Sequence, residues 1–238
     1  MATLHGIRMG PSRITTRASV ALAALVAIGV AAASALGAVT VYKNSFNSKS
    51  DAKELRHAEG KHCARSLRKK AGNLRIDVTK SPETCGYRPP VEGDTDGPDH
   101  TFVAKARFLR NKSKGLRKHA YVAISVRSGR TSGYELRVFP VKHRFRLVRN
   151  PSGGGHDFPA KGTSKAIKGF NKANVLSLKA VGSKVTARVN GAKVAKATDS
   201  NPAQVGGRKA ELAIGSGKRS SKTVSATVDD LKLQVPTP

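Results

Sequence analysis

Residues 174–198 read NVLSLKAV, GS, KVTARV, NG and AKVAKAT in succession, and this stretch decides the fold class. Apolar and polar residues alternate through the three longer runs, as they do in a strand with one buried face. Gly182–Ser183 and Asn190–Gly191 separate the runs. Asn-Gly favours a two-residue β-hairpin turn of type I′, because both residues tolerate positive φ. The stretch therefore predicts three antiparallel strands joined by tight turns.

The same alternation recurs on both sides of this stretch. Further strands are predicted at residues 74–78, 101–109, 121–127, 134–139, 144–148, 210–214 and 223–235. A weak helical pattern occurs only over residues 53–70. About ten short strands with regular turns and little helix predict an all-β fold, an antiparallel sandwich.

An uncharged segment, residues 18–42, follows three arginines at positions 8, 13 and 17. The segment is long enough to cross a bilayer as a helix, and basic residues before it favour a cytoplasmic N-terminus over residues 1–17. It predicts a single-pass membrane anchor or a signal peptide, for which Ala33-Ser34-Ala35 offers a cleavage site. A buried Ala-rich helix of a soluble domain is the alternative. In the first two cases residues 43–238 form one domain outside the cytoplasm.

The charge of the chain indicates anionic partners. Lys and Arg number 44 against 15 Asp and Glu, and the formal net charge is +29. Outside the cytoplasm nucleic acid is an improbable partner, whereas lipid head groups, phosphate-bearing wall polymers and acidic polysaccharides are within reach. A basic surface that is merely solvated, in an anionic envelope, is the alternative.

Cys63 and Cys85 are the only cysteines. In an exported chain two cysteines favour one disulfide. The competing interpretation is a metal site in which His57 and His62 join the thiolates, although Cys85 lies far from the other three for a zinc site.

Four stretches carry a likeness to a known family: YELRV (134–138), NVLSLKAVG (174–182), TARVNGAKV (186–194) and VDDLKL (228–233). Together they resemble the concanavalin A-like lectin/glucanase superfamily, in particular the laminin-G-like and family-16-like jelly rolls of bacterial surface proteins. The likeness covers roughly residues 101–236. It implies a jelly-roll β-sandwich of two curved sheets whose concave face often binds sugars, with Phe46 in the first strand. Fold alone does not decide function.

Glucanases of this superfamily carry Glu, Asp and Glu on one strand, and only Glu92-Gly-Asp94-Thr-Asp96 approaches that pattern here. The third acid is Asp, and Pro90 and Pro98 flank the run, so we expect a loop rather than a catalytic strand. A divergent glycoside hydrolase stays the alternative to a non-catalytic domain.

The same run also resembles the first half of a calcium loop. Glu92, Asp94, Asp96 and the nearby Asp99 are therefore candidate calcium ligands. The alternative is a polar turn whose acids pair with neighbouring Lys and Arg. No other cofactor is predicted.

Candidate ligand-binding residues point away from the apolar side of the central strands: Tyr121, Arg127, Glu135, Arg137 and Arg146. Arginine suits carboxylate or phosphate groups, and the chain lacks the Trp on which neutral sugars often stack. We therefore expect an exported, non-catalytic module that binds an acidic glycan or an anionic envelope polymer. A structural envelope domain without a specific ligand is a further alternative.

Overall fold

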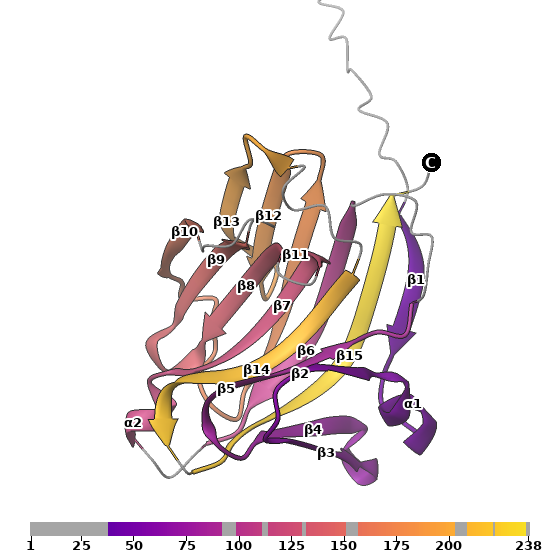
Figure 1. Ribbon diagram of the computed structural model, residues 1–238, viewed down its shortest axis with the longest axis vertical. Coiled ribbons are helices and arrows are strands. Elements are labelled where there is room, and N and C mark those ends of the chain that lie inside the picture. The colour runs from indigo at the N-terminus through magenta and orange to yellow at the C-terminus, as the bar shows by residue number, and fades with distance from the viewer. Residues whose placement is uncertain are drawn as a thin grey trace, which may run out of the picture. The chain divides into compact units, whose positions relative to one another are not determined.

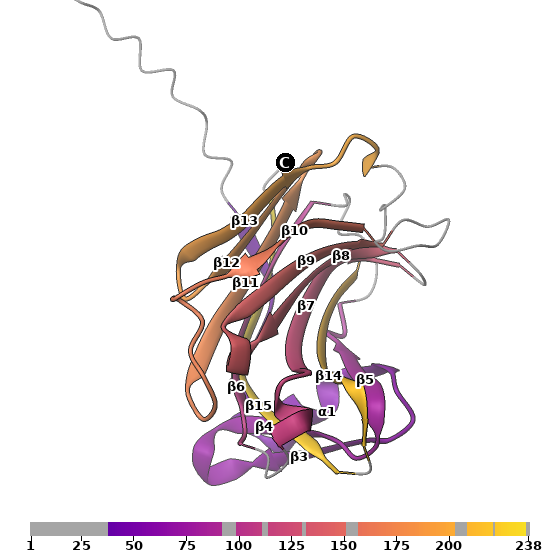
Figure 2. The same cartoon turned by 90° about the vertical axis from the view of Figure 1, so that its left-hand side faces the viewer.

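The computed structural model describes residues 38–91, 99–110, 114–129, 132–150, 157–202, 209–220 and 222–236. They fold into two antiparallel sheets that lie face to face (Figure 1). Figure 2 shows the two layers from the side, with β11 to β13 in one and β7 to β9 in the other. The predicted all-β sandwich is confirmed.

The eight-stranded sheet runs in the order β13-β12-β11-β6-β15-β4-β3, and β1 also pairs with β15. Its strands are β1 (Ala38–Asn44), β3 (Cys63–Arg68), β4 (Asn73–Val78), β6 (His100–Phe108), β11 (Ala173–Val181), β12 (Lys184–Val189), β13 (Ala192–Thr198) and β15 (Val224–Pro236).

The seven-stranded sheet runs in the order β10-β9-β8-β7-β14-β5-β2. Its strands are β2 (Arg56–Glu59), β5 (Ser81–Arg88), β7 (Ala120–Ser128), β8 (Gly133–Phe139), β9 (Arg144–Asn150), β10 (Asp157–Thr163) and β14 (Lys209–Ser220). The helices of the described residues are short: α1 (Lys49–Glu54), α2 (Lys114–Arg117), and the 3₁₀ turns η1 (Lys69–Ala71) and η2 (Pro140–Lys142).

Alternating side chains from both sheets form the core between them. Its fully buried members include Leu74, Ile76, Phe102, Phe108, Ile124, Leu136, Leu147, Leu178, Leu212 and Val228. Because side chains alternate along a strand, every second residue faces this core and the others face outward. Each sheet therefore has one outer face whose side chains do not have to be apolar to pack in the core.

The hairpins predicted over residues 174–198 are confirmed. Val189 pairs with Ala192 across the turn, and Asn190 and Gly191 have φ values of 50° and 82°. Both values are positive, as a type I′ turn requires.

The weak helical pattern over residues 53–70, which predicts at best a short helix, is wrong for most of this span. The chain forms only the short helix α1 there, begun by a capping box between Ser48 and Asp51, and then strands β2 and β3. Leu55 ends the helix in an extended conformation and is fully buried, and Gly60 adopts a φ of 95°. A turn at Gly60 and pairing of β3 with β4 outweigh the weak helical pattern.

Residues 38–42 do not continue a helix. They belong to β1, which pairs with the last strand, β15, so the sandwich begins at Ala38 rather than at residue 43. The β-branched side chains of Thr40 and Val41 suit this extended conformation. The rest of the predicted membrane or signal helix lies outside the described residues. Within the described ranges, no helix has the length and apolar character needed to span a bilayer.

Phe46 is fully buried in the core, but it follows β1 rather than lying in it, with a φ of 53°. The place in the first strand that the resemblance implies for Phe46 is therefore wrong.

Cys63 and Cys85 form a disulfide that links β3 of one sheet to β5 of the other, with Cα atoms 5.7 Å apart. The metal alternative is wrong, since the thiols are bonded to each other. The two histidines have other partners: His62 pairs with Glu83 at 2.8 Å, and His57 lies edge-on to the ring of Tyr87.

Replacing both cysteines by serine should lower the free energy of unfolding by about 3 kcal/mol, because the bridge closes a loop in the unfolded chain. Urea unfolding of the double variant, compared with the oxidised and reduced native chain, measures this loss. A midpoint equal to that of the oxidised chain would contradict the prediction.

Candidate functional site

A continuous cross-strand row lies on the outer face of the seven-stranded sheet. Strand pairing aligns Glu59 with Gly86, Gly86 with Ala213, and Ala213 with Ala123. The row continues from Ala123 through the three cations Arg137, Arg146 and Lys161. Its middle is thus a strip of small residues (Gly86, Ala213 and Ala123, hereafter the small-residue strip). An acid stands at one end and cations stand at the other.

Aromatic side chains border the small-residue strip on one side. Tyr121 and Phe139 lie 5.6 Å apart between ring centroids and pack with Ala123 and Ala213. The Tyr121 hydroxyl shares a 2.6 Å hydrogen bond with Thr84. This small cluster is separate from the main core, and its two rings lie on the outer side of the sheet but are only 7% and 8% exposed.

Arginines cover these rings. The guanidinium of Arg137 lies 5.2 Å from the centroid of the Tyr121 ring. Those of Arg144 and Arg146 lie 5.4 Å and 5.6 Å from the Phe139 centroid. A guanidinium held over a ring has a restricted orientation, and its planar N–H edge matches the geometry of planar anions.

Carboxylates border the small-residue strip on the other side. Glu211 accepts a 2.9 Å hydrogen bond from Arg88, and Glu135 accepts one from Arg137. Gly86 makes room for two of the acids. A Cβ at that position would collide with the Glu211 carboxylate and lie 2.6 Å from Cγ of Glu59.

The crowding of three acids changes their titration. Desolvation, followed by repulsion from Glu211 and Glu135, raises the pKa of Glu59 to about 7. Burial likewise raises the pKa of Glu211, although Arg88 opposes the shift. The face therefore holds carboxylates that bind hydrogen-bond donors or a proton readily, beside cations that bind anions.

Four of the five predicted ligand-binding residues come together here. Tyr121, Glu135, Arg137 and Arg146 all lie on this outer face, on neighbouring strands β7, β8 and β9. Arg127 does not, and its predicted place in a row with Arg137 and Arg146 is wrong.

A β-bulge redirects Arg127. Ser128 pairs with Lys209, but Ser125 pairs with Glu211, so β7 contains one residue more than β14 over this span. Arg127 takes up the extra length with a φ of 51°. Lys161 of β10 occupies the third place in the cation row instead.

The redirected side chain of Arg127 is 2% exposed. Its guanidinium donates to Asp99 at 2.7 Å and to the carbonyl of Gly182 at 2.6 Å, and it lies 5.6 Å from the ring centroid of Tyr134. The residue ties the β11–β12 turn to β8 and the start of β6, which is a structural role.

Asp99 is the only candidate calcium ligand among the described residues, and its carboxylate also accepts from the Gly182 N–H at 3.0 Å. Glu92, Asp94 and Asp96 lie outside the described residues. Within the described ranges, no group of three or more potential ligands is placed to hold a metal ion.

Several residues of this face escaped the sequence analysis. Glu211 lies in a strand that was predicted, and alternation from Leu212 and Ala210 could have placed it outward. Glu59 lies in the segment predicted as a helix. The importance of Gly86 depends on side chains from two other strands, which sequence spacing does not indicate.

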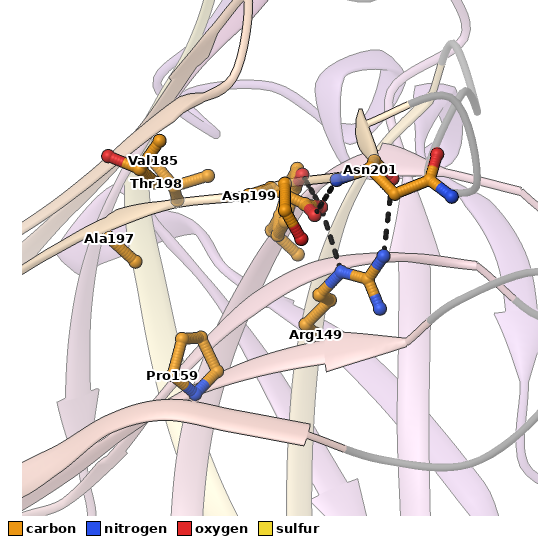
Figure 3. A pocket seen from close by; sticks show the side chains of 9 residues that line it. Arg149, Pro159, Val185, Ala197, Thr198, Asp199 and Asn201 are labelled. Carbon is orange, nitrogen blue, oxygen red and sulfur yellow. Dashed lines mark hydrogen bonds and ion pairs between the residues drawn. The ribbon is translucent and has the colours of Figure 1, made fainter.

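A hollow of about 330 Å³ opens near the end of β13 (Figure 3). Asp199 lies at its centre, 4% exposed, and accepts hydrogen bonds from Arg149 Nε and the Asn201 N–H at 2.8 Å each. The Tyr134 hydroxyl donates to the same carboxylate. Burial opposes ionisation, but these hydrogen bonds outweigh it and lower the pKa of Asp199. The acceptors of Asp199 are used within the protein, so we assign this network to fold stability.

No protein family matches this chain, and no curated protein matches it. Solved structures do match. The carbohydrate-binding module CBM66 from Bacillus subtilis matches at a TM-score of 0.55 and 14% identity, over 76% of this chain and 95% of that one. A Bacillus subtilis protein of unknown function with a galectin-like fold matches at a TM-score of 0.59 and 12% identity, over 83% of this chain and 97% of that one.

The receptor-binding domain of botulinum neurotoxin D matches at a TM-score of 0.54 and 11% identity, over 84% of this chain but only half of that one. At such identities the likeness shows the fold alone. The chain has a galectin-like β-sandwich, a relative of the jelly rolls predicted from sequence, and the narrower laminin-G-like assignment stays a resemblance.

The stability of the fold should fall as pH rises from about 4.5 to about 7, because the folded state holds a proton on Glu59 that the unfolded state has lost. The stabilisation by this proton is fully present below pH 4.5 and is lost above the raised pKa of Glu59. Since Glu59 is exposed at the sheet edge, screening limits it to about 1 kcal/mol or less. Glu59→Gln should remove this part of the pH dependence in urea unfolding. A Glu59 carboxyl resonance that titrates near 4.5 would contradict the assignment.

Asp199→Asn should lower the free energy of unfolding by about 2–3 kcal/mol, because it removes a buried carboxylate that accepts from Arg149, Tyr134 and the Asn201 N–H. Asp230→Asn is a matched control, since Asp230 is 54% exposed and pairs with Lys105 at the surface. The control should change stability by less than about 0.5 kcal/mol. Equal losses in the two variants would mean that the Asp199 network adds nothing beyond a surface ion pair.

Proposed function

We propose that this domain is a non-catalytic module that binds an acidic glycan along the outer face of the seven-stranded sheet. The observation that carries the proposal is the cross-strand row from Glu59 to Lys161, with small residues at its centre. Sugar rings need a surface without bulky side chains, carboxylates that accept from hydroxyl groups, and nearby aromatic rings. Carboxylates lie on this face, and the small residues and aromatic rings lie directly beneath its charged side chains, at most 8% exposed.

The acidic specificity rests on the cationic end of the row. Arg144 and Arg146 are held over Phe139, and Lys161 is exposed beside them. Two guanidinium edges and an ammonium at neighbouring positions suit the carboxylate of a uronic acid. Arg137 is paired with Glu135 and serves to position that carboxylate.

The neighbours in structure support binding rather than catalysis. One is named a carbohydrate-binding module and another a receptor-binding domain. The disulfide between Cys63 and Cys85 supports the proposal that the domain works outside the cytoplasm, where disulfides persist. Export by the apolar segment, as anchor or signal peptide, stays part of this proposal.

One observation favours a second candidate function. Glu59 and Glu211 meet over Gly86, and the pKa of Glu59 is raised to about 7. Glycoside hydrolases use two carboxyl groups, one of them protonated near neutral pH. A divergent hydrolase is therefore the alternative that the binding experiment must separate.

We expect the full-length protein to bind polygalacturonate more tightly than a neutral glucan, in titration calorimetry at physiological salt. Arg146→Gln should weaken polygalacturonate binding by about tenfold, the value of one charge-assisted contact. Arg68→Gln removes the same charge from an exposed position on β3 of the other sheet and should leave affinity unchanged. Equal losses of affinity in Arg146→Gln and Arg68→Gln would mean that the net charge of the domain binds the polymer without a defined site.

Gly86→Ala tests the acidic side of the site. The added methyl group must displace the Glu211 carboxylate, so affinity should again fall about tenfold. Gly217→Ala on β14 meets no atom within 4 Å and is the control. If the protein releases reducing ends from the glycans, and this release disappears in Glu211→Gln, the domain is a hydrolase and the binding proposal is wrong.

A further inference from the structure

The outer face of the eight-stranded sheet has a different chemistry from the face described above. Strands β11, β12 and β13 present five cations to solvent and contain no Asp or Glu. These cations, hereafter the lysine face, are Lys179, Lys184, Arg188, Lys193 and Lys196.

Strand register interleaves these cations with hydroxyl groups. Lys196 pairs with Thr186, Thr186 with Lys179, and Lys179 with Thr101 of β6. In the next row Arg188 lies between Lys193 and Ser177. Neighbouring strands are about 5 Å apart, and alternate residues along a strand are about 7 Å apart. The result is a two-dimensional pattern of ammonium and hydroxyl donors.

Among the residues that the structure describes, no carboxylate forms an ion pair with these five cations. The ion pairs on the same sheet lie elsewhere, between Arg75 and Asp77 and between Lys105 and the acids of β15. Within the described ranges, Lys179 and Lys184 have no carboxylate within ion-pair distance. On the seven-stranded sheet, by comparison, two of the arginines are paired with glutamates.

The lysine face is hollowed where its rows meet. A groove of about 490 Å³ is lined chiefly by Thr101, Ser177, Lys179, Lys184, Thr186 and Arg188. An extended polymer can therefore lie in contact with cations and hydroxyl groups at once.

We propose that this groove is a second binding site, for a linear polymer of phosphodiester groups, independent of the glycan site on the other sheet. Lysine supplies a compact charge with rotatable donors, and the planar fork of Arg188 in the same groove also matches phosphate oxygens. Phosphate oxygens accept bonds from ammonium and hydroxyl groups together. An extended glycerol phosphate chain repeats over a length close to the spacing of alternate residues on β12.

The position of the two sites adds a consequence. They lie on opposite outer faces of a sandwich whose sheets pack about 10 Å apart, so occupancy of one does not block the other. The domain can hold an acidic glycan and a phosphodiester polymer at the same time, as a bridge between two layers of an envelope.

The test measures binding of the full-length protein to soluble poly(glycerol phosphate) at physiological salt. Lys179→Gln combined with Lys184→Gln should weaken it about tenfold, and raising the salt should weaken the native protein steeply. The control is Lys69→Gln combined with Lys70→Gln, which removes two exposed lysines from η1. The control should change affinity by less than about twofold.

Polygalacturonate is measured with the same variants. The Lys179 and Lys184 double variant should bind it as the native chain does, so failure of the glycan site and failure of the lysine face give different patterns. Equal loss of poly(glycerol phosphate) binding in the control would overturn the proposal, as would no loss in the Lys179 and Lys184 variant. Capture by phosphatidylglycerol vesicles without binding of the soluble polymer would also overturn it, in favour of a membrane surface.

Discussion

The pairing of β14 with β5 on one side and β7 on the other is the constraint on which the candidate site depends. It brings Gly86, Ala213 and Ala123 into one cross-strand row from segments up to about 130 residues apart in the chain. A one-residue slip of β14 would turn Glu211 into the core and Leu212 outward, which the buried face forbids. The register that buries Leu212 is therefore the register that assembles the site.

The two outer faces show how one fold separates two chemistries. Both are free of the core's demand for apolar side chains, yet one combines arginines with glutamates and aromatic rings, and the other has lysines with hydroxyl groups. Paired arginines over aromatic rings are rigid and suit a defined ligand. Unpaired lysines are mobile, strongly hydrated charges and suit a repeating anion. The net charge of the chain does not reveal this division.

The errors of the sequence analysis have physical causes. Arg127 was expected outward because alternation was carried through to the end of its strand, but a bulge at that position reverses the side chain. A short helix within residues 53–70 was expected from a weak apolar spacing, which pairing of β3 with β4 and a turn at Gly60 outweigh. In both cases pairing with another strand decided a local conformation. The periodicity of a segment does not indicate with which strand it will pair.

By itself the sequence determined the all-β class, the hairpins over residues 174–198, the disulfide, and the outward position of Tyr121, Glu135, Arg137 and Arg146. These follow from the period of two along a strand, from the φ preferences of Asn-Gly, and from the cysteine count. Only the tertiary structure decided that Glu59 and Glu211 meet over Gly86, that Lys161 completes the cation row, and that the lysines of β11 to β13 form one face. Those juxtapositions depend on which strands become neighbours, and strand order is set by packing of the whole core rather than by any one segment.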